Sequence, residues 1–208
     1  MAANTLITVE LDQAKLREVQ QMLREIPREM PKILCRSLND AAVHARSQAV
    51  KELATELTVR QKDIRDSLRV RKATYTDLSA AVTIGDQRIG LIGYAARQGA
   101  RGVSYQIHKG VSRDALRSTF FATMASGHRA VFKRVGEYRV GPRSSGKYWS
   151  KWRRQKIMEL RGPSLGVVSE DAPAIIERVQ EESLAYAEKR LDAQVALILG
   201  RRSKGSAA

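Results

Sequence analysis

The stretch Phe120–Gly136 reads FFATMASGHRAVFKRVG, and the fold that the sequence predicts is organised around it. Its first half is apolar and small, and the Ser126-Gly127 dipeptide that follows is typical of a turn. The second half, His128–Val135, alternates imperfectly between polar and apolar residues. The pattern predicts a buried segment, a turn and a half-buried strand with a cationic outer face.

All three phenylalanines of the chain lie in this stretch, at Phe120, Phe121 and Phe132. Aromatic residues make up only 5% of the sequence, so the chain has few large side chains with which to fill a core. Such side chains dominate the packing of cores and interfaces. We therefore predict that these three rings lie in the core or in an interface between subunits.

Positive charge is the strongest global feature of the sequence. Lys and Arg number 37 against 22 Asp and Glu, a formal net charge of +15. Between Arg97 and Arg161, 16 Lys and Arg residues stand against three acids, which leaves +13. Such a field indicates a polyanionic partner, which would be nucleic acid, an acidic protein surface or a membrane face. A solvated face that only aids solubility is the alternative.

Length and cysteine content are those of an ordinary globular chain. The 208 residues suit one domain that is large enough to be stable without disulfide cross-links. Cys35 is the only cysteine, so no internal disulfide can form, and we interpret it as a small apolar filler on a helix. No apolar run approaches the roughly 18 residues of a membrane span, and the first basic residue is Lys15. We expect no signal peptide, no membrane partner and folding in a reducing cytosol.

The N-terminal part predicts a strand and two helices. Thr5–Leu11 is apolar and β-branched, as in a strand, and Asp12 then caps a helix from Gln13 to about Glu25. Pro31 suits the first turn of a longer helix that reaches about residue 57. Apolar residues recur on it at three- and four-residue steps, and many are alanine, so another element should pack closely. This stripe comprises Leu34, Leu38, Ala41, Ala42, Ala45, Ala49 and Leu53.

The middle of the chain changes to a two-residue period. Thr58 is expected to cap a short helix that ends near Leu68. Alternating segments then predict an antiparallel meander with one face on the helices, and Gln98–Gly102 is expected to be a flexible cationic loop within it. The expected strands are Leu68–Arg71, Leu78–Ile84, Ile89–Ile92 and Val103–His108.

The C-terminal part predicts a turn at Leu160–Gly166 and a final helix. Ser169 or Asp171 caps this helix, Pro173 lies in its first turn, and it ends at Gly200. The predicted fold class is α+β: an antiparallel sheet with the long Ala-striped helix and a C-terminal helix packed on it. The expected division is 1–30, an N-terminal strand and short helix; 31–199, the α+β domain with a basic loop insertion at 137–156; and 200–208, a disordered tail.

Five blocks of the sequence, in order, suggest a family. They are Ser37–Ala42 with Ala45-Arg46, Ile64–Thr74, Ala95–Gln98 with Gly102–Ser104, Phe121–Phe132, and Leu160–Ser164. Together they resemble the prophage minor tail protein Z family, the tail completion proteins of long-tailed bacteriophages. The resemblance covers roughly residues 33–168, and the chain departs from the family pattern between Glu137 and Lys156.

The resemblance implies a non-enzymatic structural protein of the virion, assembled in the host bacterial cytoplasm. Such a protein would act at the head-proximal end of the tail, in the neck, in tail completion and head–tail joining. The implied partners are its own copies in a ring, the tail terminator, the tail tube, the head–tail connector and genomic DNA in a DNA-conducting channel. Because tail tubes are six-fold, we expect the ring to be a hexamer.

Enzymatic interpretations fit the sequence poorly. Gly141–Lys147 matches the phosphate-loop pattern GxxxxGK, but Tyr148 stands where Ser or Thr would hold Mg²⁺, and Pro142 removes a backbone N–H. The acids of the basic region are too few and scattered for a nuclease. His44, His108 and His128 lie far from any Ser or Asp signature. We expect no catalytic residue, no metal site and no cofactor.

The basic segment near residue 150 is the candidate contact site for a nucleic acid or an acidic partner. Bases can stack on its tryptophans while its cations meet phosphates. The alternative is that the tryptophans pack on a neighbouring subunit. The candidate residues are Arg143, Lys147, Trp149, Lys151, Trp152, Arg153 and Arg154. Two hypotheses follow: a structural ring protein of the phage neck, or a free-standing, sequence-independent nucleic-acid-binding protein.

Overall fold

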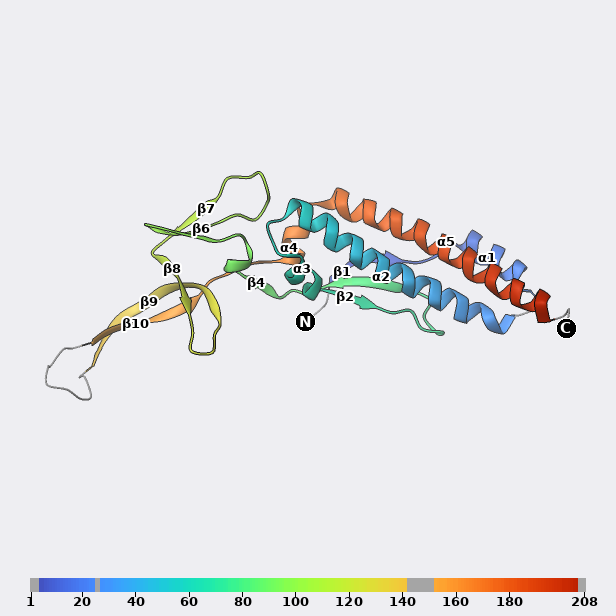
Figure 1. Ribbon diagram of the computed structural model, residues 1–208, viewed down its shortest axis with the longest axis horizontal. Helices are drawn as coiled ribbons and strands as arrows, with labels where there is room; N and C mark the ends of the chain where they lie inside the picture. Colours follow the sequence, from blue (N-terminus) through green and yellow to red (C-terminus); the bar gives the residue numbers. More distant parts are fainter. Residues whose placement is uncertain (1–3, 25–26, 142–151, 206–208) are drawn as a thin grey trace. The chain divides into compact units, whose positions relative to one another are not determined.

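The structure is a computed structural model that describes residues 4–24, 27–141 and 152–205 (Figure 1). For residues 4, 27, 138–141, 152–154 and 201–205 it describes the backbone alone. The chain forms two compact units, each assembled from segments that are distant in sequence. Unit 1 comprises Met1–Thr55, Gln61–Gln87 and Ser164–Ala208, and unit 2 comprises Glu56–Arg60 and Arg88–Pro163.

Unit 1 contains a three-stranded antiparallel sheet in the order β1-β3-β2. The strands are β1 (Asn4–Val9), β2 (Leu68–Arg71) and β3 (Ala80–Ile84). The central strand β3 is buried at Ala80, Ala81, Val82 and Ile84, as expected of a strand paired on both edges. The predicted first strand and the pairing of the next two are confirmed.

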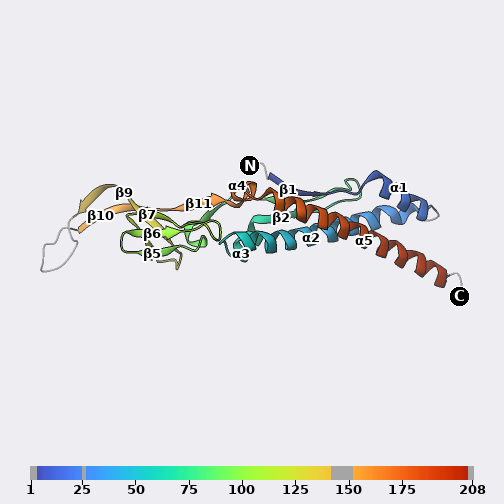
Figure 2. The ribbon, with the colours of Figure 1, turned by 90° about the horizontal axis from the view of Figure 1, so that it is seen from above.

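Two long antiparallel helices lie side by side in unit 1, α2 (Met30–Glu56) and α5 (Pro173–Gly205) (Figures 1 and 2). All seven residues of the predicted Ala-rich stripe are buried on α2. Between the helices, Arg190 Nε donates to Asp40 Oδ2 at 3.1 Å, and Arg178 pairs with Glu52 at 2.9 Å. The ring of His44 stacks on Tyr186 with centroids 4.1 Å apart. The α+β class with two packed helices is confirmed.

Shorter helices complete unit 1. They are α1 (Gln13–Met22), the 3₁₀ turn η1 (Pro27–Glu29), α3 (Gln61–Ser67) and α4 (Leu165–Glu170). Val19 and Leu23 join Ile33, Leu191 and their neighbours in one apolar cluster. Asp12 precedes α1 but its side chain makes no capping hydrogen bond.

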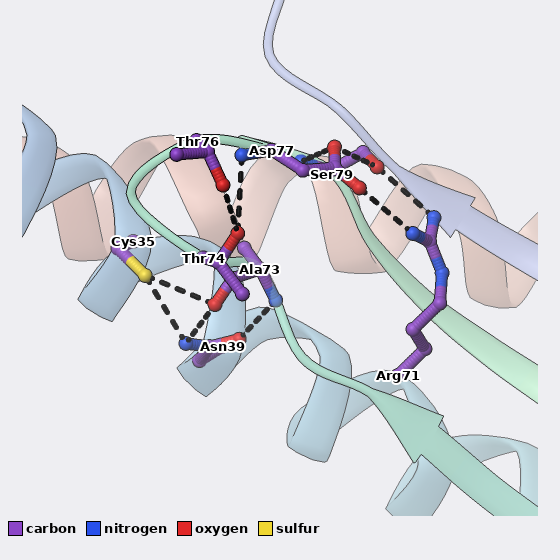
Figure 3. A network of polar contacts seen from close by, with 8 residues as sticks. All are labelled: Cys35, Asn39, Arg71, Ala73, Thr74, Thr76, Asp77 and Ser79. Atoms are coloured by element: carbon purple, nitrogen blue, oxygen red, sulfur yellow. Dashed lines mark hydrogen bonds and ion pairs between the residues drawn. The ribbon is translucent and has the colours of Figure 1, made fainter.

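The loop between β2 and β3 is fastened to α2 by one asparagine (Figure 3). Asn39 Oδ1 accepts from the Ala73 N–H at 2.8 Å, and its Nδ2 donates to the Ala73 carbonyl at 3.3 Å. Cys35 donates to the same carbonyl at 3.0 Å. Further along the loop, Asp77 is held by Arg71 at 2.9 Å and by the Ser79 hydroxyl at 2.7 Å. Two blocks that carry the family resemblance therefore meet in this network.

Unit 2 contains two three-stranded antiparallel sheets, β5-β6-β7 and β10-β9-β8, and a two-stranded sheet of β4 and β11. The strands are β4 (Arg88–Gly90), β5 (Arg97–Gly99), β6 (Gly102–Tyr105), β7 (Asp114–Arg117), β8 (Thr119–Thr123), β9 (Arg129–Gly141), β10 (Trp152–Glu159) and β11 (Arg161–Ser164), and the 3₁₀ turn η2 is Leu91–Gly93. Leu91, Val103 and Val131 form its buried core.

A tight corner carries the chain from β7 to β8. Ser118 has a positive φ of 61°, which few residues other than glycine adopt. The next side chain, Thr119, is buried and supports the corner, because its Oγ1 accepts from the Val103 N–H at 2.9 Å and donates to the Leu116 carbonyl at 2.7 Å. The predicted turn at Ser126-Gly127 and the strand after it are confirmed, and that strand is β9. The segment before the turn, predicted to be buried, is strand β8, in which Phe120, Phe121 and Ala122 are only half-buried.

Several predictions of local structure were wrong. The strands do not form one meander, since β4 pairs with the distant β11 and the turn predicted at Leu160–Gly166 is β11 followed by α4. The expected loop at Gln98–Gly102 is a β5–β6 hairpin. Thr58 does not cap α3, because the helix begins only at Gln61; the Thr58 hydroxyl donates instead to the Ile107 carbonyl at 3.2 Å.

Two C-terminal features also differ from expectation. Residues 137–141 and 152–156, expected in a basic loop, belong to the paired strands β9 and β10. Helix α5 continues past Gly200 to Gly205. A single glycine inside a helix costs only about 1 kcal/mol relative to alanine, so it need not end one.

Candidate functional site

The charge of the chain follows the boundary between the two units. Unit 2 holds 18 Lys and Arg residues and four acids, a formal charge of +14. Unit 1 holds the other 19 Lys and Arg residues but 18 acids, which leaves +1. The cationic field predicted from the sequence is therefore a property of one folded unit, and unit 2 is the candidate site for a polyanionic partner.

Arginines cover the phenylalanines of the β8–β9 hairpin. Phe132 is 5% exposed and faces Phe120 across the strands, with ring centroids 6.5 Å apart. Phe120 and Phe121 are half-buried. The guanidinium of Arg134 lies 5.3 Å from the Phe120 centroid, and that of Arg129 lies 5.3 Å from the Phe121 centroid. Cation–π stacking holds both cations in place on the sheet.

The strands β9 and β10 present further cations beyond this hairpin. Lys133 is paired in register with Met158, and Lys156 with Val135. Among the side chains that the structure describes, neither lysine has an acidic partner. Glu159 is occupied instead by His128 at 3.3 Å and by Arg161 at 3.9 Å.

Most of the predicted contact residues belong to the segment between β9 and β10 in the sequence. Arg143, Lys147, Trp149 and Lys151 lie outside the described residues. Trp152, Arg153 and Arg154 begin β10, where their backbones pair with Gly141, Val140 and Arg139, and their side chains are not among those described. Their contact with a nucleic acid or an acidic partner stays a prediction. Of the GxxxxGK pattern, only Gly141 is described, and it lies at the end of strand β9.

Tyr94 and Gly162 form a packing contact that sequence reasoning missed. Tyr94 is fully buried, and its hydroxyl donates to the Pro163 carbonyl at 2.8 Å. Burial raises the pKa of Tyr94 to about 12. A Cβ on Gly162 would lie 2.4 Å from the Tyr94 ring, so the ring occupies the space that a side chain would need. The Gly-Pro dipeptide is the only sequence signal at this position, and it is typical of a turn.

The described residues offer no metal site, since they include no group of three His, Cys, Asp or Glu side chains that could hold an ion. His44 stacks on Tyr186 and His128 pairs with Glu159, so both have structural contacts. Within the part of the chain that the structure describes, no helix combines the length and apolar character needed to cross a membrane.

Comparison with known families gives the identity of the chain. The profile of the family described as prophage minor tail protein Z (GPZ) matches residues 15–140, which is more than half of the sequence. The chain belongs to this family. The match extends from α1 into β9 and includes the loop network of Asn39 and the cationic hairpin. Searches of curated proteins and of solved structures found no match.

As a member of this family, the chain is a structural protein of a phage tail and a component of the virion. The family of structural tail proteins is generally non-enzymatic. The resemblance inferred from the five sequence blocks is confirmed, and four of those blocks lie within the matched region.

Proposed function

We propose that this minor tail protein Z is a tail completion protein. It acts in the neck, at the head-proximal end of the tail, and makes the tail competent to join a DNA-filled head. Its family membership supports a place in the tail. The single observation that carries the proposal further is the separation of charge, which leaves unit 1 nearly neutral and unit 2 at +14. One unit is suited to assembly with proteins and the other to a polyanion.

Unit 1 is the part proposed to form a ring and to contact the tail. Most of the exposed large apolar side chains lie on it, and such side chains are a feature of protein interfaces. They are Met22, Val43, Tyr75, Val167, Leu197 and Leu199. Homo-oligomers usually close with point symmetry, and a protein that caps a six-fold tube would close as a hexamer. The tail terminator, the tail tube and the head–tail connector are the proposed neighbours.

Unit 2 is the part proposed to face DNA in the conducting channel, or an acidic ring neighbour. Arg129, Lys133 and Lys156 lie on one face of the β10-β9-β8 sheet and Arg134 lies on the other. Among the side chains that the structure describes, none of the four has an acidic partner, so they supply cations for this contact. We expect Arg143, Lys147, Lys151, Arg153 and Arg154 to add to this contact. Binding of this kind is electrostatic and independent of sequence.

The test is complementation of a phage that lacks this protein. Without it, we expect heads and full-length tails that remain separate or form non-infectious particles, and wild-type protein supplied in trans should restore infectivity. Joined, infectious particles in its absence would overturn the proposal. The second candidate, a free-standing nucleic-acid-binding protein, is favoured by the charge alone. It predicts a monomer that binds DNA tightly and is missing from purified virions, whereas the tail protein should form a ring by native mass spectrometry or on the tail itself.

The basic segment near residue 150 is tested separately with the triple variant Lys151→Ala, Arg153→Ala and Arg154→Ala. If these residues bind phosphates, the log–log slope of DNA affinity against salt should fall by about 0.7–0.9 for each phosphate that is no longer neutralised. An unchanged slope rules out a DNA role for these three residues. If the variant also assembles infectious particles normally, this basic segment only aids solubility.

A further inference from the structure

The outer face of the β5-β6-β7 sheet carries arginines and small residues. In an antiparallel sheet, residues paired across strands place their side chains on the same face. Arg97 pairs with Ser104, which pairs with Ala115, and Gly99 pairs with Gly102, which pairs with Arg117. These six residues therefore share one face.

The opposite face holds the core contacts and the only acid of these strands. Val103 is fully buried there, and Tyr105 and Leu116 pack against the core. Asp114 pairs in register with Tyr105, so it lies on this side. Burial, and then the nearby Asp114 carboxylate, raise the pKa of the Tyr105 hydroxyl. The alternation of the strands therefore keeps the acid away from the arginine face.

A groove of about 460 Å³ is lined by the β5–β6 turn and the adjoining parts of β6 and β7. Arg101, in the turn, and Arg117, at the end of β7, are its two charged lining residues. Both are exposed, as is Arg97 on the same sheet. Among the described side chains none of the three has an acidic partner, so their charge is available to a ligand.

Two other residues shape this face. Arg113 is immobilised by Ser104 Oγ at 3.3 Å, Gln106 Oε1 at 3.3 Å and the Ser104 carbonyl at 3.1 Å, so it supports the sheet and is not free to bind. Gly102 has φ 149°, and a Cβ there would lie 2.0 Å from the Leu116 carbonyl oxygen. A residue without a side chain is required at Gly102, so no side chain from this position fills the groove.

We propose that this groove binds the phosphodiester backbone of DNA, with Arg101 and Arg117 on phosphates and no reading of base sequence. Protein interfaces depend on large aromatic and apolar anchors. None of the exposed large apolar side chains described in the structure lines this groove. Apart from Val103 and Leu116, the other residues that line the groove with the two arginines are small, so a charged backbone can approach closely. Phosphate contacts of this kind give affinity without specificity.

The groove is separate in sequence from the basic segment near residue 150. It deepens the proposed function, on which it rests, by naming a second DNA contact. The test measures binding of purified protein to a short random-sequence DNA duplex by fluorescence anisotropy across a salt series. The groove variant is Arg101→Ala with Arg117→Ala. The matched control is Arg36→Ala with Arg69→Ala, which removes the same charge from exposed positions of unit 1.

We expect the groove variant to lower the log–log salt slope by roughly 1.5–2, since each phosphate that a cation neutralises contributes about 0.9. The control should keep the wild-type slope. Arg101→Lys with Arg117→Lys preserves the charge and should retain most of it. Circular dichroism and thermal unfolding should match wild type for every variant, because the two replaced side chains are exposed and unpaired.

A wild-type slope in the groove variant overturns the proposal, as does an equal reduction in the control. If the groove variant binds DNA normally but fails to complement the phage, the groove serves an acidic protein partner and the DNA proposal is also wrong. Failure of the proposed function looks different. It would appear as infectious particles in the complete absence of the protein, whatever the DNA affinity of the groove.

Discussion

Replacing Gly162 by alanine tests the packing that joins β11 to the rest of unit 2. The new methyl carbon would lie 2.4 Å from Tyr94 Cε2 and 2.8 Å from Cδ2. Favourable carbon–carbon contacts lie near 3.5–4.0 Å, so the ring or the strand must move by about 1 Å. Tyr94 is fully buried and its hydroxyl is bound to the Pro163 carbonyl, so the ring cannot move without disturbing that hydrogen bond.

We expect Gly162→Ala to lower the free energy of unfolding by about 2–4 kcal/mol, combining overpacking with a weakened buried hydrogen bond. The assay is urea denaturation followed by circular dichroism. Gly90→Ala is the matched control in unit 2, because its new Cβ would meet Glu159 Oε1 at 3.7 Å and Ile92 at 4.0 Å, which are ordinary contacts. The control should change stability by less than about 0.5 kcal/mol. A Gly162→Ala protein as stable as the control would refute the packing argument.

Three further perturbations test other contacts. Burial raises the pKa of Tyr94 to about 12 from its ordinary 10.0, so as the pH rises the unfolded chain loses the hydroxyl proton before the folded chain does. The free energy of unfolding should therefore fall between pH 10 and 12. In denaturation measured across this pH range, Tyr94→Phe should remove that part of the fall. Asn39→Ala leaves both backbone groups of Ala73 without their amide partner and should cost about 1–3 kcal/mol in the same assay, and unchanged stability would mean that the loop is held by other interactions. Phe132→Ala should lower the free energy of unfolding by about 3–5 kcal/mol, whereas Phe121→Ala, which removes a half-buried ring, should lower it by about 1–2 kcal/mol. Equal losses of stability in the two variants would contradict the difference in burial between the two rings.

Local patterns were sufficient to predict the elements whose contacts are regular. The three- and four-residue spacing of α2 predicted its buried stripe, from Leu34 to Leu53, because a helix turns its side chains at a fixed angle. The Ser126-Gly127 turn predicted the β8–β9 hairpin, because the two strands are adjacent in sequence. The concentration of charge was also evident from composition.

Features that depend on distant residues could not be predicted in this way. The pairing of β4 with β11 joins segments about seventy residues apart, and no local period encodes it. Thr58 is a residue type that often caps helices, but α3 begins only at Gln61, and the Thr58 hydroxyl donates to the Ile107 carbonyl from another segment of the chain. The half-burial of Phe120 and Phe121 depends on arginines that stack on them, and a hydropathy pattern records those arginines only as charges.

The positive charge of the candidate site was predicted, but the residues and geometry of the groove were not. The sequence indicated a cationic region and a basic segment around Lys147–Arg154, which lies largely outside the described residues. The groove between Arg101 and Arg117 could not be recognised, because the glycine-rich segment around Arg101 has the composition of a flexible loop. Its arginines share a face only because β5, β6 and β7 pair in the observed register.

Cryo-electron microscopy of the intact virion neck tests the central claim most directly. We predict density for this protein at the head-proximal end of the tail, in a closed ring of six, with the cationic unit 2 turned toward the DNA in the lumen. Density at the distal tip or along the tube, or a ring whose lumen is lined by the nearly neutral unit 1, would contradict it.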